Sequence, residues 1–144
     1  MVVEMRNFLI RVVPIVLYLI AATIVAGTLA IAENNPIGNW SGVVNQSNRN
    51  IVVTLRIKSL QIGNIGGSMR WGTPRVCSLQ TEYSGMRDTR YTFNIAGTNG
   101  GWCDLYRDGS LSLEMDNTQR ESLTFSLANK QGRGLIEGQL AAQH

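Results

Sequence analysis

Hydrophobic and polar positions alternate with a period of two through most of the chain after residue 33. Such alternation gives a strand one apolar face for a core and one polar face for water. Strands of this kind are typical of antiparallel sheets, which are covered on one face only. The apolar positions of the four clearest runs are Ile51, Val53, Leu55 and Ile57; Tyr91, Phe93 and Ile95; Leu111, Leu113 and Met115; and Leu123, Phe125 and Leu127.

Short turn signals separate these runs. Gly63-Asn64 divides residues 51–62 from 65–71, and Asp108-Gly109 stands between residues 102–107 and 110–116, which predicts a two-residue hairpin there. We expect eight or nine strands, from near Gly38–Val44 to near Gly134–Ala141. The connections are too short for parallel crossovers, so the sequence predicts an antiparallel meander.

The end strands of such a meander need to be covered. Closure into a barrel removes both edges, and a barrel of about eight strands is filled by side chains or holds one small ligand. The predicted fold is therefore all-β: an antiparallel meander of eight to nine strands closed as a small barrel. A two-sheet sandwich is the alternative, but no long Greek-key crossover is evident.

The N-terminal part of the chain has the order of an export signal. Arg6 and Arg11 precede an uncharged run, Val12–Ala32, that ends in small residues. Two interpretations stay open: a signal peptide cleaved after Ala32, or a retained signal-anchor helix of about 31 Å that spans the bilayer. Under both, the N-terminus is cytoplasmic and Glu33–His144 is extracytoplasmic, either secreted, periplasmic or at the cell surface.

The length and charge of Glu33–His144 indicate one domain and argue against a nucleic-acid-binding protein. This part is the size of one domain, and its 11 Lys and Arg nearly balance its 9 Asp and Glu. It contains no basic run, so the electrostatic footprint of a nucleic-acid-binding protein is missing.

The two cysteines, Cys77 and Cys103, are an even number in an exported small domain, which favours a disulfide. Cys77 shares a face with apolar residues of its strand, whereas Cys103 alternates with Trp102, Asp104 and Tyr106 and so lies on the face opposite to these residues. Both point into one core only if Gly100-Gly101 forms a bulge; otherwise the disulfide lies at the barrel rim. A metal site would need more ligands than these two, so we expect no metal.

The sequence offers little for catalysis. The only histidine is the terminal His144, so the serines lack an evident base. The acidic residues do not follow the spacing of a calcium loop, and no pattern brings two of them together as a catalytic pair. We therefore expect neither an enzyme nor a cofactor.

Large aromatic residues supply the best candidate binding surface. If exposed, Trp71, Arg75 and Trp102 form a patch near one barrel end, since Trp is enriched at recognition surfaces. The alternative is that Trp102 packs on the disulfide beside Cys103.

Gly38-Asn39-Trp40 stands just before the first strand. Gly-x-Trp at this place resembles the first motif of lipocalins and the opening of avidin-like barrels. The resemblance implies a lipocalin-like barrel in which Trp40 plugs one end. The later Trp pattern of avidins is absent, so no biotin site is implied.

A second resemblance covers roughly residues 40–140. The segments that carry it are Gly67–Trp71, Cys77–Leu79, Tyr91–Phe93, Gly101–Cys103, Gly109–Leu113, Leu123–Phe125 and Gly138–Leu140. Their order resembles small extracytoplasmic β domains of bacteria, some free-standing and some attached to membrane-bound Ser/Thr kinases. The resemblance implies a sensor-like or structural module, with cysteines at these two positions.

These observations predict a non-catalytic, exported binding or interaction module. It is either soluble or a membrane-tethered accessory subunit of a larger complex. The alternatives are an inhibitor of an extracellular enzyme, or a lipocalin-like carrier of a small apolar ligand. The carrier predicts an open cavity lined by Leu55, Phe93, Leu113 and Phe125, whereas the module predicts a filled core.

Overall fold

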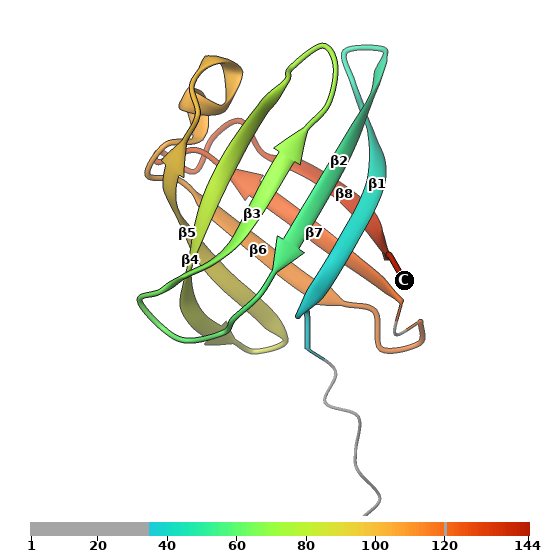
Figure 1. Ribbon diagram of the computed structural model, residues 1–144, viewed down its shortest axis with the longest axis vertical. Coiled ribbons are helices and arrows are strands. Elements are labelled where there is room, and N and C mark those ends of the chain that lie inside the picture. The colour runs from blue at the N-terminus through green and yellow to red at the C-terminus, as the bar shows by residue number, and fades with distance from the viewer. Residues whose placement is uncertain (1–34, 120) are drawn as a thin grey trace, which may run out of the picture. The chain divides into compact units, whose positions relative to one another are not determined.

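The computed structural model describes residues 35–119 and 121–144 (Figure 1). The expected leader, residues 1–32, lies outside the described residues. The described part contains eight strands and one short 3₁₀ helix. Their bounds are β1 Gly38–Gln46, β2 Arg49–Ile57, β3 Ile65–Trp71, β4 Cys77–Arg87, β5 Arg90–Thr98, η1 Gly101–Tyr106, β6 Ser110–Met115, β7 Ser122–Ala128 and β8 Ile136–Ala142.

The eight strands form a closed antiparallel barrel in sequence order, as the alternating pattern predicted. The seam joins β1 to β8, where Trp40 is opposite Ala142 and Ser41 is opposite Ala141. Closure gives each of the eight described strands two hydrogen-bonded neighbours, so none of them is a free sheet edge. The two-sheet sandwich is thereby excluded.

The seam depends on a close approach of two backbones. A Cβ atom on Gly42 of β1 would lie 2.3 Å from the backbone oxygen of Gln139 in β8. This distance is far below van der Waals contact, so only glycine lets β1 and β8 meet here without a shift of the backbone.

Side chains fill the barrel interior. Leu55, Phe93, Leu113 and Phe125 expose no more than 1% of their surface. The exposed fraction counts surface that a water molecule can touch, including the surface of an internal cavity. Side chains with almost no exposed surface therefore do not line a water-sized cavity inside the barrel. The inward positions of the four strands that the sequence made clearest are accordingly packed rather than hollow.

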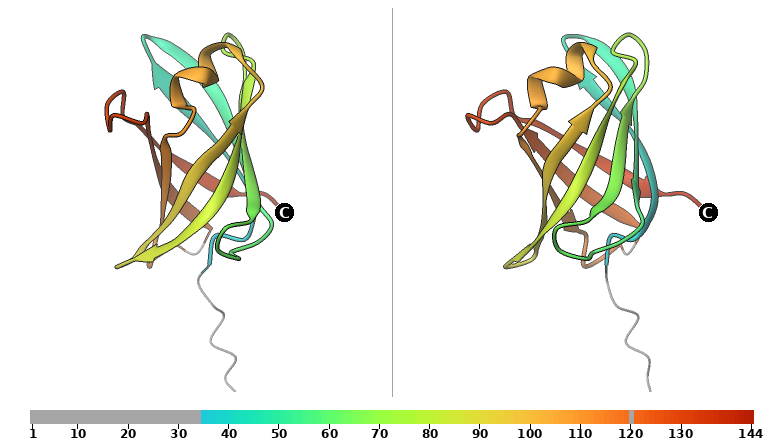
Figure 2. Two further views of the ribbon diagram at one scale, coloured as in Figure 1. Left: turned by 90° about the vertical axis from the view of Figure 1, so that its left-hand side faces the viewer. Right: turned by 60° about the vertical axis from the view of Figure 1, so that its left-hand side comes forward.

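The segment 102–107 corrects one expectation. It was predicted as a strand joined to the next by a hairpin at Asp108-Gly109, but Gly101–Tyr106 is the 3₁₀ helix η1, and β5 pairs directly with β6. Gly100 and Gly101 both have positive φ, at 98° and 66°, which turns the chain out of the sheet before η1. Figure 2 shows η1 at the same barrel end as the β1–β2 turn.

No helix among residues 35–119 and 121–144 has the length and apolar character needed to cross a bilayer.

Candidate functional site

The structure brings the three predicted binding residues together at the η1 end of the barrel. The rings of Trp71 and Trp102 meet edge to face with centroids 4.9 Å apart. The Arg75 guanidinium lies 4.7 Å above the Trp102 ring, which is a cation–π arrangement. Trp71, however, is only 3% exposed, so its ring is part of the core and is not open to a partner.

Further contacts hold this aromatic cluster in place. Tyr106 of η1 stacks at a tilt on Trp102, with 5.0 Å between centroids. Its hydroxyl donates to the Gly134 carbonyl at 3.0 Å, and burial raises the pKa of this hydroxyl. Arg75 also donates from Nη2 to Gln46 Oε1 at 3.4 Å. The cluster is mainly a packed closure of the barrel end, and its role as a binding surface stays a prediction.

The disulfide lies at the same end. Cys77 is the first residue of β4 and Cys103 belongs to η1, and their Sγ atoms are bonded with 5.9 Å between the Cα atoms. Both residues are buried. The bond joins the start of β4 to the helix that follows Gly100 and Gly101. Of the two positions predicted for the disulfide, it therefore occupies the one at the barrel rim.

Trp40 is 4% exposed and points inward from the beginning of β1. Its Nε1 donates to the Pro36 carbonyl at 2.8 Å, so the polar edge of the ring is satisfied by the chain that leads into β1. The plug role implied by the lipocalin resemblance stays a prediction.

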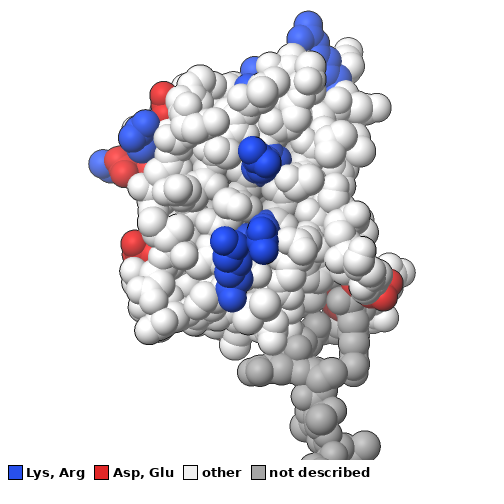
Figure 3. All heavy atoms as spheres, in the orientation of Figure 1, with Lys and Arg blue, Asp and Glu red and all other residues white. Residues whose placement is uncertain are grey.

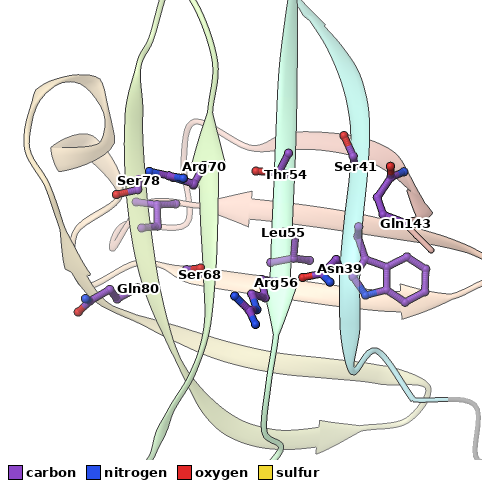
Figure 4. A pocket seen from close by; sticks show the side chains of 12 residues that line it. Asn39, Ser41, Thr54, Leu55, Arg56, Ser68, Arg70, Ser78, Gln80 and Gln143 are labelled. Atoms are coloured by element: carbon purple, nitrogen blue, oxygen red, sulfur yellow. The ribbon is translucent and has the colours of Figure 1, made fainter.

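A site that the sequence reasoning missed lies on the outer surface of β1–β4. Two rows of outward side chains run across these strands, and we call them together the β1–β4 face. By strand register the first row is Asn39, Arg56, Ser68 and Gln80, and the second is Ser41, Thr54, Arg70 and Ser78. They line a shallow hollow of about 470 Å³, and Figure 4 shows their side chains spread over the four neighbouring strands.

The two arginines of the β1–β4 face have no carboxylate partner among the described residues. The four ion pairs of this part of the chain all join residues beyond position 81: Arg90–Glu114, Arg107–Asp104, Lys130–Asp108 and His144–Glu121. Figure 3 shows the basic groups in the middle of this face among uncharged atoms, with acidic groups only towards the margins. The face therefore presents a positive, hydrogen-bonding surface.

Two of the acidic residues considered for calcium binding, Asp104 and Asp116, are engaged in local contacts. A hydrogen bond donated by the Thr98 hydroxyl, followed by one from Arg107, lowers the pKa of Asp104. The Thr118 hydroxyl and backbone N–H similarly lower the pKa of Asp116. Within the described ranges, no group of three or more His, Cys, Asp or Glu side chains is arranged to hold a metal ion.

Comparison with known proteins adds no assignment to this geometry: no family model, no curated protein and no solved structure matches the chain. The β1–β4 face is consequently the candidate site on the strength of its own residues.

Proposed function

We propose that this protein is a non-catalytic, exported interaction module whose partner binds to the outside of the barrel, on the β1–β4 face. The observation that carries the proposal is the hollow in that face, which contains two exposed arginines that have no carboxylate partner among the described residues. Arg is enriched at protein interfaces, because its guanidinium combines charge, a flat surface and several donors.

The filled interior supports binding on the outside. A carrier of the lipocalin kind needs a cavity bordered by Leu55, Phe93, Leu113 and Phe125, yet none of these side chains exposes more than 1% of its surface. No described feature favours the carrier, so it is not developed as a second candidate.

Two features support an extracytoplasmic location. Disulfides persist mainly in oxidising compartments, and Cys77–Cys103 is formed in the structure. The residues before Glu33 have the order of an export signal. The mass of the protein recovered from cells separates the two forms of the proposal: a soluble chain that begins at Glu33 is a free module, and a full-length chain in the membrane fraction is a tethered subunit.

Site-specific photo-crosslinking in the native cell tests the proposed face. A photoreactive residue replaces Thr54 in β2, and in a matched variant it replaces Thr124 in β7, which is also exposed and outward-facing. We expect a discrete covalent adduct from position 54 and none from position 124. Adducts from position 124 alone, or from neither position, would refute the proposal.

A further inference from the structure

An apolar row borders the β1–β4 face at its disulfide end. Val43 and Val52 are directly opposite each other on β1 and β2, and both point outward. The backbone N–H of Gly72 donates to the Val52 carbonyl, and Val76 follows in the loop before β4. The three valines are 59%, 53% and 72% exposed, so together they form an apolar surface next to the arginines.

Two of the three valines line a hollow that adjoins the one containing the arginines. A second hollow, of about 340 Å³, is lined by Val52, Val76 and their neighbours. It shares Thr54, Arg70 and Ser78 with the larger hollow that contains Arg56. A ligand that lies over both hollows therefore covers Val52 and Val76 and reaches both guanidinium groups.

The spacing of the rows matches that of an extended peptide. Val52, Thr54 and Arg56 are successive outward residues of β2, and Arg70 is opposite Thr54 on β3. The valine row, the Arg70 row and the Arg56 row thus follow one another at about 6.7 Å, the rise of two strand residues. An extended ligand presents alternate side chains at the same interval.

We propose that the β1–β4 face binds an extended acidic segment of a partner protein, with an apolar side chain on the valines and carboxylates at Arg70 and Arg56. In the segment, the acidic residues stand two and four positions from the apolar one. This inference rests on the proposed function and adds the chemistry of the partner.

The composition of the face favours a protein partner over a sugar, a nucleic acid or a lipid surface. Recognition of sugars and bases relies on exposed aromatic rings, but the two tryptophans that line the hollows, Trp40 and Trp71, are 3–4% exposed. Anionic membranes attract clusters of four to eight cations, whereas Arg56 and Arg70 are the only cations among the residues that line the two hollows. An apolar patch beside arginines with a polar rim is the composition of a protein interface.

The backbone at Val76 is a separate observation in favour of binding. Its φ of 42° lies in the left-handed region, which is unfavourable for a β-branched side chain. The fold nonetheless holds this valine out in solvent. Strained residues concentrate at ligand-binding sites, where the surrounding structure maintains an orientation that contact with a ligand requires.

Peptide titration followed by NMR measures this specificity directly. The probes are synthetic peptides containing Val-Thr-Glu-Thr-Glu and the reverse order, added to the isotope-labelled protein in the form that cells retain. We expect at least one order to shift the amides of Val52, Thr54, Arg70 and Val76 in a saturable way. A peptide of the same composition with adjacent glutamates, Val-Thr-Thr-Glu-Glu, should bind at least threefold more weakly.

Protein variants then identify the contacts. Arg56→Gln with Arg70→Gln should weaken binding at least tenfold, whereas the control, Arg87→Gln with Arg133→Gln, removes the same charge elsewhere and should change it less than twofold. Val76→Thr keeps the β-branched shape and should weaken the binding of Val-Thr-Glu-Thr-Glu, but not that of Thr-Thr-Glu-Thr-Glu, which lacks the valine. No saturable shift with either peptide order, equal loss in both double variants, or tighter binding of galacturonic-acid oligomers or phosphatidylglycerol vesicles to the same face would overturn the inference.

Negative results in the peptide titration and in the crosslinking test have different consequences. A discrete adduct at position 54 together with peptides that do not bind would leave the interaction module standing and remove the acidic segment. Absence of the adduct would remove the module itself.

Discussion

The outward surfaces of the two halves of the barrel, β1–β4 and β5–β8, differ in whether their charged side chains have partners on neighbouring strands. On β5–β8 the charged groups find partners across the strands: Arg90 contacts Glu114 at 3.1 Å, and Ser126 donates to Glu137 at 3.0 Å. On β1–β4, Arg56 and Arg70 stand opposite serine and threonine. Both halves have the same alternation, so alternation alone does not distinguish a self-paired surface from one whose charges are left for a partner.

Removal of the disulfide should change the stability of the barrel most. The bond lies at the barrel end at which the β1–β4 face stops, and it closes a long loop. Cys77→Ser with Cys103→Ser opens a loop of sequence separation 26. In the chain-entropy model this loss lowers the free energy of unfolding by about 3.5 kcal/mol. Urea unfolding of the double variant measures it, and a loss below about 1 kcal/mol would show that the bond does not constrain the unfolded chain as assumed.

Closure at the seam can be broken next. Gly42→Ala places a methyl group against the Gln139 carbonyl, so β1 and β8 have to separate. We expect a loss of about 1–3 kcal/mol, the usual cost of overpacking. Ser41→Ala, at the adjacent outward position, should cost much less. Equal thermal stability of the two variants would contradict the close seam.

The hydroxyl of Thr81 is a buried polar group whose removal should stabilise the barrel. Thr81 of β4 is fully buried, and its hydroxyl has no hydrogen-bond partner in the structure. Thr81→Val keeps the shape and removes the desolvated hydroxyl, so we expect a gain of about 1 kcal/mol. Thr81→Ser, which keeps the hydroxyl and loses a methyl group, should destabilise. A destabilising valine would indicate that the hydroxyl is satisfied in solution.

The comparison of the two surfaces is sharpened by removing charges from each. Arg90→Gln breaks an exposed ion pair and should cost about 0.5 kcal/mol, which high salt reduces. Arg56→Gln with Arg70→Gln removes no pair, so stability should change by less than about 0.5 kcal/mol in either direction. Denaturant titrations at low and high salt measure both. A clear, salt-sensitive loss in the Arg56/Arg70 variant would show that these side chains have partners within the barrel.

The smallest expected effect is a loss of stability at low pH. The pKa of Asp104 and of Asp116 is lowered in the folded state, chiefly by hydrogen bonds from Thr98 and Thr118. Because the folded pKa is below the unfolded one, the stability they contribute is present above the unfolded pKa of 3.8 and is lost as the pH falls through the folded pKa. The melting temperature should therefore fall slightly on acidification below pH 3.8, and Asp104→Asn with Asp116→Asn should flatten that fall. An unchanged pH profile in the double variant would contradict the assignment.

The sequence predicted the barrel well because its period-two runs are long and clear. The inward residues Leu111 and Phe125 were identified correctly because alternation depends only on local chain geometry. Residues 102–107 were misassigned because their structure depends on two glycines with positive φ and on a disulfide to a distant strand. The run 51–62 likewise ends as a strand at Ile57, ahead of a loop.

The candidate site was missed although one signal was available. Residues 34–81 contain five basic residues and no acidic one, whereas residues 82–144 contain six basic and eight acidic residues. Charge summed over the whole domain conceals this division. The register that places Arg56 diagonally from Arg70 could not be derived from the sequence, since it depends on the length of the β2–β3 loop.

Crosslinking from position 54 in three charge backgrounds tests the central claim, that the unpaired arginines of the β1–β4 face bind a partner. The photoreactive residue replaces Thr54 in the otherwise unchanged chain, in Arg56→Gln with Arg70→Gln, and in Arg87→Gln with Arg133→Gln. We predict that the adduct disappears only in the second background. An adduct of equal yield in all three would contradict the claim.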